Sequence, residues 1–287
     1  MKPRRSGVIV VALGLILALA VTAVPATAQD ALICRKRDNQ GDKSGDTHRL
    51  GAGKDYFNGG DGDDVIYGGP GDDILNGGRG NDRIFGGPGN DIVCGGLNND
   101  KVFGDDGADE VYGEEQNDFL DGGPGNDYMN GQADRDRILG YGVENGVAIA
   151  DGNDFIEGSF EEDVIVVGGF DIAFGGADDD VISSKTPAER AERLDGGLDD
   201  DQIFGSEAAD KLIFGDAGDD LLRGGGGADE IRGGNNEDKL FGDGGDDLLF
   251  GELGNDQLSG GSETDVCDVG AQDDTADESC ERRVDVP

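Results

Sequence analysis

Residues Gly59–Cys94 read as four consecutive nonapeptides, GGDGDDVIY, GGPGDDILN, GGRGNDRIF and GGPGNDIVC. Each has glycine at positions 1, 2 and 4, aspartate at position 6 and a large apolar residue at position 8. Self-similarity at a fixed period is the sequence signature of a repeat architecture. The period therefore takes precedence over any prediction made segment by segment, and we read the rest of the chain in the same frame.

The nonapeptide predicts a turn followed by a very short strand. Its glycines suit a backbone with positive φ or a close approach of two chain segments, and they disfavour a helix. Positions 7 to 9 place one inward side chain between two outward ones in an extended strand. Two nonapeptides form one coil, so each stacks on the second one along, with parallel strands about 4.8 Å apart. The sequence predicts an all-β parallel β-roll, a β-helix-like solenoid with two repeats per coil.

Stacking brings the position-6 carboxylates of successive coils close together, where like charges repel. The glycine turns leave main-chain carbonyl groups in the same place. A hard divalent cation with roughly six to eight oxygen ligands at about 2.3–2.6 Å satisfies both kinds of group. Ca²⁺ fits better than Mg²⁺, which requires octahedral geometry and holds its waters tightly. We therefore expect multiple Ca²⁺ ions, each between the loops of two stacked nonapeptides.

The nonapeptides resemble the glycine-rich repeat GGxGxDxUx of the RTX (repeats-in-toxin) family, in which U is a large apolar residue. The resemblance extends over roughly Leu50 to Asp268. It implies a calcium-bound parallel β-roll whose ions are ligated by loop carbonyls and by the position-6 aspartate. The typical RTX protein is exported by a C-terminal signal, whereas this chain carries an N-terminal one. This departure from the family pattern argues against a toxin.

The predicted calcium ligands are the position-6 aspartates of the better repeats. They are Asp55, Asp64, Asp73, Asp82, Asp91, Asp100, Asp109, Asp118, Asp127, Asp201, Asp210, Asp220, Asp229, Asp238, Asp247 and Asp256. Between Gly113 and Val166 the repeats are less regular, and we expect their loops to bind calcium weakly or to leave sites empty. The substitutions in and beside this region are Asn98, Gln116 and Asp134 at position 4 and Asn145 at position 6.

The repeats divide the chain into segments. We predict a signal peptide at 1–28, a polar segment at 29–49, a first calcium-binding roll at 50–183, an insertion at 184–195, a second calcium-binding roll at 196–268 and a C-terminal cap at 269–287. The frame slips near Val167, where one block is short, and one extra residue lies near Phe214.

The first 28 residues have the features of a secretory signal. Basic residues at 2, 4 and 5 precede the apolar run Val8–Val24, and Ala26-Thr27-Ala28 matches a cleavage site. An uncleaved anchor is the alternative, although a run of about 17 apolar residues is at the short limit for crossing a bilayer. We expect cleavage after Ala28, a secreted or cell-surface location, and no membrane insertion of the mature chain.

The insertion at 184–195 departs from the repeat because Ser184 to Asp195 contains no glycine. Residues 186–189, Thr-Pro-Ala-Glu, read as a capping box with proline at the first helical position. We predict a short helix at about Pro187–Leu194 that projects from the roll. It is either a docking element or a tolerated surface insertion.

The four cysteines suggest covalent closure of the solenoid ends. We predict a disulfide between Cys267 and Cys280, which would pin the tail over the last coil and protect an open sheet edge. A pair between Cys34 and Cys94 would close the other end, and the sequence leaves that pairing open.

Three aromatic residues, Tyr67, Phe85 and Phe103, occupy position 9 of alternate nonapeptides. We expect them to stack as a ladder on the outer face. Such a ladder stabilises neighbouring strands, and a partner-binding stripe is the alternative.

The composition restricts the function. The net charge of −41 disfavours binding to nucleic acid or anionic membranes, and it requires counterions for a compact fold. The single histidine excludes His-dependent catalytic triads and HExxH zinc sites. Almost nothing beside the signal and tail lies outside the repeats, so we expect no enzymatic activity. The predicted protein is a monomeric extracellular calcium binder that folds on binding calcium. The alternative is a structural or adhesive surface protein that binds cell-surface or matrix components and uses the roll as a calcium-stiffened spacer.

Overall fold

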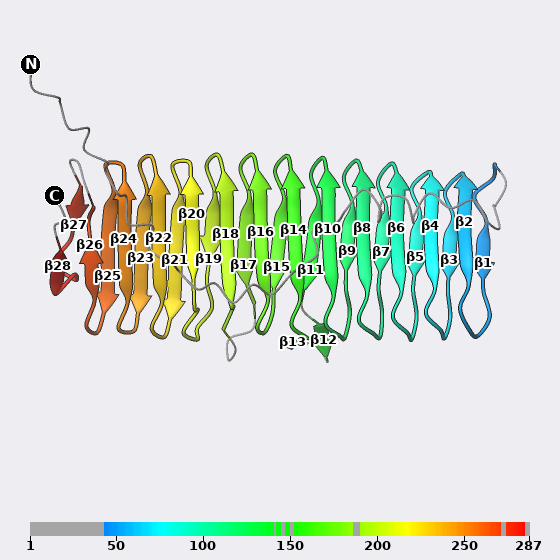
Figure 1. Cartoon of the computed structure of the whole chain (residues 1–287), viewed down its shortest axis with the longest axis horizontal. Coiled ribbons are helices and arrows are strands. Elements are labelled where there is room, and N and C mark those ends of the chain that lie inside the picture. Colours follow the sequence, from blue (N-terminus) through cyan, green and yellow to red (C-terminus); the bar gives the residue numbers. More distant parts are fainter. Residues whose placement is uncertain are drawn as a thin grey trace, which may run out of the picture.

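The computed structural model describes residues 43–140, 142–144, 147–149, 152–185, 190–270 and 274–284. The described chain winds into one elongated roll made of two parallel sheets of 13 strands each (Figure 1). The chain alternates between the sheets, so each coil contributes one strand to each. The predicted all-β parallel β-roll with two repeats per coil is confirmed.

Within each sheet the strands pair in the order in which they follow along the chain. Sheet 1 contains β1 (Thr47–Arg49), β3 (Val65–Tyr67), β5 (Arg83–Phe85), β7 (Lys101–Phe103), β9 (Phe119–Asp121), β11 (Arg137–Gly140), β15 (Val164–Val167), β17 (Val181–Ser184), β19 (Gln202–Phe204), β21 (Leu221–Gly226), β23 (Lys239–Gly244), β25 (Gln257–Ser262) and β27 (Thr275–Ala276). Sheet 2 contains β2 (Tyr56–Asp61), β4 (Ile74–Arg79), β6 (Ile92–Leu97), β8 (Glu110–Glu115), β10 (Tyr128–Ala133), β14 (Phe155–Phe160), β16 (Ile172–Ala177), β18 (Arg193–Leu198), β20 (Ile213–Ala217), β22 (Glu230–Asn235), β24 (Leu248–Leu253), β26 (Val266–Asp268) and β28 (Arg282–Val284).

The position-8 side chains of both sheets form a single apolar column between them. Register places Ile66 beside Ile84 in sheet 1 and Leu75 beside Val93 in sheet 2, and all four are fully buried. Burial of each such side chain contributes about 2 kcal/mol, whereas a three-residue strand alone has too few contacts to be stable. Stacking therefore creates the core.

The outer face carries the predicted aromatic ladder. The rings of Tyr67 and Phe85 stack with centroids 5.0 Å apart, and those of Phe85 and Phe103 with centroids 4.8 Å apart. The guanidinium group of Arg49 lies over the ring of Tyr67 at 4.1 Å. The ladder stabilises neighbouring strands, as cross-strand aromatic pairs do.

One nonapeptide leaves the roll, which corrects the expectation that every block up to Val166 stacks. Strand β10 pairs with β14 and β11 with β15, and the paired residues are 27 apart in sequence instead of 18. The residues between form the antiparallel hairpin of β12 (Gly142–Glu144) and β13 (Val147–Ile149), which lies outside both sheets (Figure 1). The expelled block is the one with Asn145 at position 6.

The predicted helix at Pro187–Leu194 is wrong for the described part of that segment. Residues 186–189 lie outside the described residues, but β18 begins at Arg193. Ala191 and Leu194 are fully buried against the roll. A projecting helix would expose both residues, whereas here both side chains pack in the apolar column. Both sheets continue across the insertion, since β16 pairs with β18 and β17 with β19, and the two predicted rolls are therefore one.

The shorter irregularities agree with the sequence. Asp154 and Asp171 occupy equivalent positions only 17 residues apart, which is the predicted slip near Val167. Asp201 and Asp220 are 19 apart, which is the predicted extra residue near Phe214.

The tail does not lie across the last coil but adds one more, because β27 pairs with β25 and β28 with β26. Cys267 and Cys280 form the predicted disulfide, with Cα atoms 5.7 Å apart. Cys94 is also disulfide-bonded. Cys34, whose pairing with Cys94 the sequence leaves open, and the predicted signal peptide lie outside the described residues. Within the part of the chain that is described, no helix is long and apolar enough to span a bilayer.

Candidate metal centre

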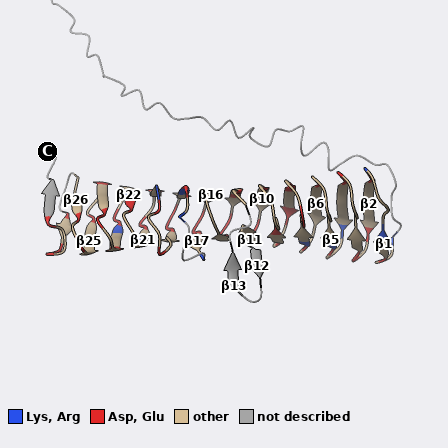
Figure 2. Ribbon diagram, turned by 90° about the horizontal axis from the view of Figure 1, so that it is seen from below, with Lys and Arg blue, Asp and Glu red and all other residues tan. Residues whose placement is uncertain are grey.

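The turns between strands form two edges along the roll, and Figure 2 shows acidic residues in successive turns. We name them edge 1, formed by the loops that lead into the strands of sheet 1, and edge 2, formed by the loops that lead into sheet 2. Every described non-glycine residue with positive φ lies at position 2 or 4 of its block. Asn98, Gln116 and Asp134 have φ of 86°, 76° and 68°, although they replace glycine. The backbone turn is therefore kept in these loops, and their weaker calcium binding stays a prediction.

The position-6 carboxylates form a hydrogen-bonded ladder along each edge. The N–H of Asp64 donates to Oδ1 of Asp82, and the N–H of Asp82 donates to Oδ1 of Asp100, both at 2.7 Å. Edge 1 repeats this contact without interruption through Asp46, Asp64, Asp82, Asp100, Asp118, Asp136, Asp163, Asp180, Asp201, Asp220, Asp238, Asp256 and Asp274. One oxygen of each carboxylate is thus fixed by the preceding coil.

Edge 2 has the same ladder with one interruption. It runs through Asp55, Asp73, Asp91, Asp109, Asp127, Asp154 and Asp171, and then from Asp210 through Asp229, Asp247 and Asp265 to Glu281. Ala191 occupies the intervening position. Its N–H donates to Oδ1 of Asp210 at 2.7 Å, but it has no carboxylate of its own.

The second oxygen of most of these carboxylates is buried and has no hydrogen-bond partner. This holds for Oδ2 of Asp73, Asp82, Asp91, Asp100, Asp109, Asp118, Asp136, Asp163, Asp180, Asp201, Asp220, Asp229, Asp238, Asp247, Asp256 and Asp265. The exceptions include Asp171 and Asp210, whose Oδ2 atoms accept the main-chain N–H groups of Gly168 and Ser206. An unpaired buried carboxylate oxygen is costly, and such an oxygen in a native fold calls for a bound ion or water. Its repetition along both edges indicates a repeated ligand.

The position-1 glycines show where that ligand would lie. A Cβ on Gly113 would lie 2.6 Å from Oδ2 of Asp118 and 2.7 Å from the carbonyl oxygen of Gly131. On the preceding coil of edge 1, a Cβ on Gly95 would lie 2.7 Å from Oδ2 of Asp100 and from the carbonyl oxygen of Gly113. At Gly95 and Gly113, the carboxylate oxygen of the same nonapeptide and a main-chain carbonyl of the next coil therefore converge on the bare face of the glycine. These are the hard oxygen donors that Ca²⁺ prefers.

Side chains alone do not complete a site. Among the described residues, no three or more His, Cys, Asp or Glu side chains form a cluster that could hold a metal. Since Ca²⁺ takes roughly six to eight oxygens, most ligands would have to be main-chain carbonyls. Main-chain carbonyl oxygens of the next coil lie beside the carboxylates at Gly95 and Gly113.

Burial strongly raises the pKa of the ladder carboxylates. It raises the pKa of Asp82 to about 7, of Asp100 to about 8 and of Asp118 to about 9. The hydrogen bond from the preceding coil lowers each pKa, and neighbouring carboxylates raise it further. Without a cation these groups favour the protonated form near neutral pH, whereas a nearby dication favours the ionised form.

The structure places every predicted ligand in one of the two ladders. It adds eight aspartates that the predicted ligand set omitted: Asp46, Asp136, Asp154, Asp163, Asp171, Asp180, Asp265 and Asp274. Asp136, Asp154 and Asp163 stand at position 6 of the unbroken frame, so the period alone could have identified them. Glu281 follows no repeat, and only the register of the last coil reveals it.

The comparison with protein-family models agrees with this geometry. The model of the RTX calcium-binding nonapeptide repeat matches residues 44–75, 67–102, 103–138, 168–184, 188–216, 214–249 and 241–276. The unmatched interval between 138 and 168 contains the expelled hairpin. No curated protein matches the chain.

Proposed function

Because the chain belongs to the RTX calcium-binding nonapeptide repeat family, we propose that it is an extracellular protein that folds as multiple Ca²⁺ ions bind between its stacked loops. The observation that carries this proposal is the buried, unpartnered Oδ2 that recurs on both edges. The position-6 aspartates and the glycine carbonyls would hold the ions. When bound, Ca²⁺ would supply the positive charge that the ladder carboxylates lack.

The charge balance supports coupling between calcium and folding. The chain has 64 acidic and 23 basic residues, and each ladder brings carboxylates within hydrogen-bonding distance of the preceding coil. Repulsion among them opposes the compact state. Ions that bind only the folded state stabilise it by mass action. Calcium at the millimolar concentrations found outside cells would then act as the folding trigger after export.

The test is a calcium titration of the chain without its signal peptide. Far-ultraviolet circular dichroism should change from coil to strand as calcium is added to chelator-treated protein, and isothermal titration should count several ions per chain. Magnesium at the same concentration is the control and should not produce the change, because its octahedral shell fits carbonyl-rich loops poorly. Equal strand content in excess chelator and in calcium at neutral pH would refute folding on binding.

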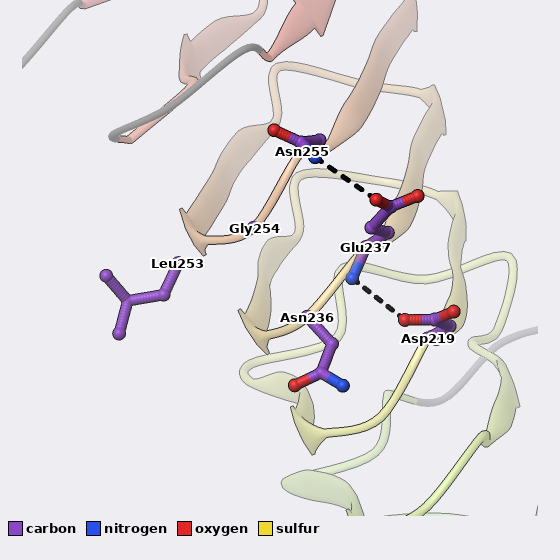
Figure 3. A pocket seen from close by; sticks show the side chains of 6 residues that line it. All are labelled: Asp219, Asn236, Glu237, Leu253, Gly254 and Asn255. Carbon is purple, nitrogen blue, oxygen red and sulfur yellow. Dashed lines mark hydrogen bonds between the residues drawn. The ribbon is translucent and has the colours of Figure 1, made fainter.

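We also propose that the protein is not an enzyme, and a surface pocket supports this. The pocket in Figure 3 is lined by turn residues of three successive coils on one edge: Asp219, Asn236, Glu237, Leu253, Gly254 and Asn255. The N–H of Glu237 donates to Asp219 at 3.0 Å, and the amide of Asn255 donates to Glu237 at 3.1 Å. These contacts link one coil to the next, and the lining contains no nucleophile paired with a base.

The alternative is a surface protein in which the roll serves as a spacer, and the elongated shape in Figure 1 favours it. Calcium would then stiffen a rod between two attachment points. Retention of the protein on washed cells, with release by chelator, would support the spacer. Recovery only in the soluble secreted fraction would support a free calcium binder.

A further inference from the structure

The last coil of the roll has an unusual sequence. Residues 277–281 read Asp-Glu-Ser-Cys-Glu, with no glycine and no aspartate at the expected spacing, and they lie beyond the last family match. The chain nevertheless completes a coil there, since β28 pairs with β26 in parallel register. A different set of contacts must therefore shape this turn.

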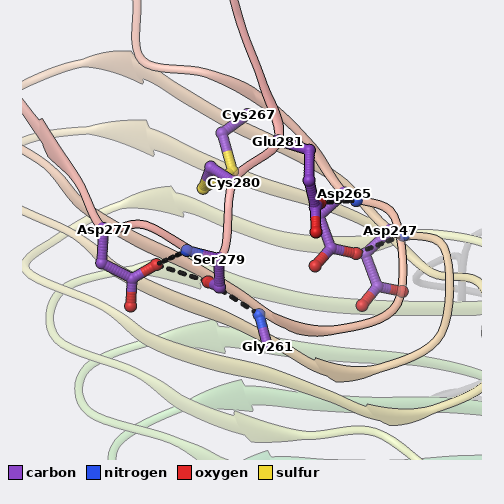
Figure 4. Close-up of a disulfide and its surroundings, with 8 residues drawn as sticks. All are labelled: Asp247, Gly261, Asp265, Cys267, Asp277, Ser279, Cys280 and Glu281. Atoms are coloured by element: carbon purple, nitrogen blue, oxygen red, sulfur yellow. Dashed lines mark hydrogen bonds between the residues drawn. A yellow bond between two sulfur atoms is a disulfide. The ribbon is translucent and has the colours of Figure 1, made fainter.

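Glu281 takes the place of a position-6 aspartate in the edge-2 ladder. The N–H of Asp247 donates to Oδ1 of Asp265 at 2.9 Å, and the N–H of Asp265 donates to Oε2 of Glu281 at 2.7 Å (Figure 4). The separation between Asp265 and Glu281 is 16 residues instead of 18. The longer glutamate side chain fills the ladder position from a shortened coil.

The ladder position below Glu281 has the same unsatisfied oxygen as the interior coils. Asp265 is fully buried, and its Oδ2 has no hydrogen-bond partner. A Cβ on Gly260 would collide with that oxygen, so the glycine keeps the space beside it open. A buried, unpartnered carboxylate oxygen is thus present in the last nonapeptide loop of edge 2, and only the turn that carries Glu281 follows it on this edge.

The turn that carries Glu281 is held in place by two further contacts. The disulfide joins Cys280, adjacent to Glu281, to Cys267, and both cysteines are buried at the end of the apolar column (Figure 4). The hydroxyl of Ser279 accepts the N–H of Gly261 at 2.9 Å. These contacts fix the last turn against the preceding coil without any glycine.

We propose that Glu281 is a calcium ligand, which together with Asp265 forms a terminal Ca²⁺ site at the C-terminal end of edge 2. This inference rests on the proposed calcium-dependent folding. It assigns a metal-binding role to a residue outside the nonapeptide motif, and it assigns the disulfide the task of positioning that ligand. The last ion would lie at the end of the ladder, where no position-6 aspartate follows Asp265 and Glu281 supplies the carboxylate of the next coil instead.

The test compares Glu281→Gln with the unchanged chain by hydrogen exchange at a series of calcium concentrations. Glutamine keeps a carbonyl oxygen that can accept the N–H of Asp265, but it removes the charge. The calcium concentration that half-protects peptides within 256–284 should rise roughly tenfold, equivalent to about 1.4 kcal/mol. Protection within 64–136 serves as the internal reference and should not move. Glu278→Gln, on an exposed residue of the same turn, is the matched control and should leave both regions unchanged.

The outcomes separate the two proposals. If no region responds to calcium in any variant, the proposed function fails. If residues 64–136 respond normally while Glu281→Gln leaves the C-terminal midpoint unchanged, Glu281 is only a hydrogen-bond acceptor and the terminal site is refuted. Cys267→Ala/Cys280→Ala should raise the same C-terminal midpoint, because the ligand loses its tether, and an unchanged midpoint would refute the role of the disulfide.

Discussion

The carboxylate ladder is continuous along edge 1 and interrupted at one position along edge 2. Edge 1 carries an unbroken ladder from Asp46 to Asp274, while edge 2 has Ala191 between Asp171 and Asp210. The coils nevertheless stack in the same way at this point. Strand β18 pairs with β16 on one side and β20 on the other, and the fully buried Leu194 lies in register between Ala173 and Ile213.

The difference separates two roles that the repeat combines. Backbone pairing and the position-8 column hold one coil on the next even where the carboxylate is missing. The position-6 aspartate is therefore not required for stacking at Ala191, yet it is buried almost everywhere else at a cost in desolvation. We infer that the aspartate is buried in order to bind a ligand, whereas the backbone and the position-8 side chains are sufficient for stacking.

The largest effect should come from pH, because it acts on both ladders at once. In the calcium-free fold, burial raises the pKa of Asp91 to about 6, of Asp100 to about 8 and of Asp118 to about 9, from an ordinary value of 3.8. The folded state then binds protons that the unfolded chain releases, so its stability is fully present below about pH 4 and is lost as pH rises through about 6 to 9.

The measurement is circular dichroism in excess chelator. Strand content should increase as the pH falls from 9 to about 4. In saturating calcium this increase should be absent, since the ions replace the protons. A chelated chain that loses strand content on acidification would contradict the raised pKa values, and with them the burial of the carboxylates in the calcium-free roll.

The next effect concerns the space beside a ladder carboxylate. In Gly113→Ala, the new Cβ would lie 2.6 Å from Oδ2 of Asp118 and 2.7 Å from the carbonyl of Gly131. We expect a loss of about 3 kcal/mol in the free energy of unfolding with calcium present, as overpacking at a rigid site produces. Gly51→Ala is the control, because its Cβ would meet nothing within 4 Å. Equal effects of the two variants in urea unfolding would show that the carboxylate of Asp118 and the carbonyl of Gly131 do not restrict the space beside Gly113.

A smaller effect should follow from removal of one charge on edge 1. Asp118→Asn keeps an oxygen to accept the N–H of Asp100, a contact of 2.7 Å, but it removes a ligand. With saturating calcium we expect a loss of about 2 kcal/mol, the range for a charge-assisted contact. At about pH 4 in chelator, where protons take the place of the ions and the roll should stay folded, the same variant should lose less stability, because it replaces a carboxyl group that is already neutral there. A loss of the same size in both conditions would mean that Asp118 acts only through its hydrogen bond.

The period predicted most of the fold and of the site. Glycines at positions 1, 2 and 4, aspartate at 6 and an apolar residue at 8 determine the turn, the ladder and the column, and the structure follows that assignment on both edges. The single histidine and the acidic composition also point to oxygen ligands, and the match to a calcium-binding repeat family agrees with that expectation.

Three features could not be predicted, each for a physical reason. The expelled block keeps the period of nine, so no frame shift reveals that β10 pairs with β14. The capping-box pattern at Thr186-Pro187-Ala188-Glu189 reports only a local preference for a helix, whereas Ala191 and Leu194 are buried because they pack against neighbouring coils. Glu281 follows a shortened coil with no repeat, so its place in the ladder depends on strand register alone.

The smallest effect is the most specific, because it repairs the interruption on edge 2. Ala191→Asp restores a carboxylate at the one ladder position that lacks it. In saturating calcium we expect about 1 kcal/mol of added stability in urea unfolding. At limiting calcium the added buried charge should lower the folded fraction. The effect of the substitution on stability should therefore be favourable in saturating calcium and unfavourable at limiting calcium. Ala177→Asp adds the same charge at position 3 of a loop on edge 1 and should change stability by less than about 0.5 kcal/mol. If Ala191→Asp destabilises the roll at every calcium concentration, the loop before β18 cannot hold an ion, and edge 2 then consists of two separate binding ladders joined only by the core.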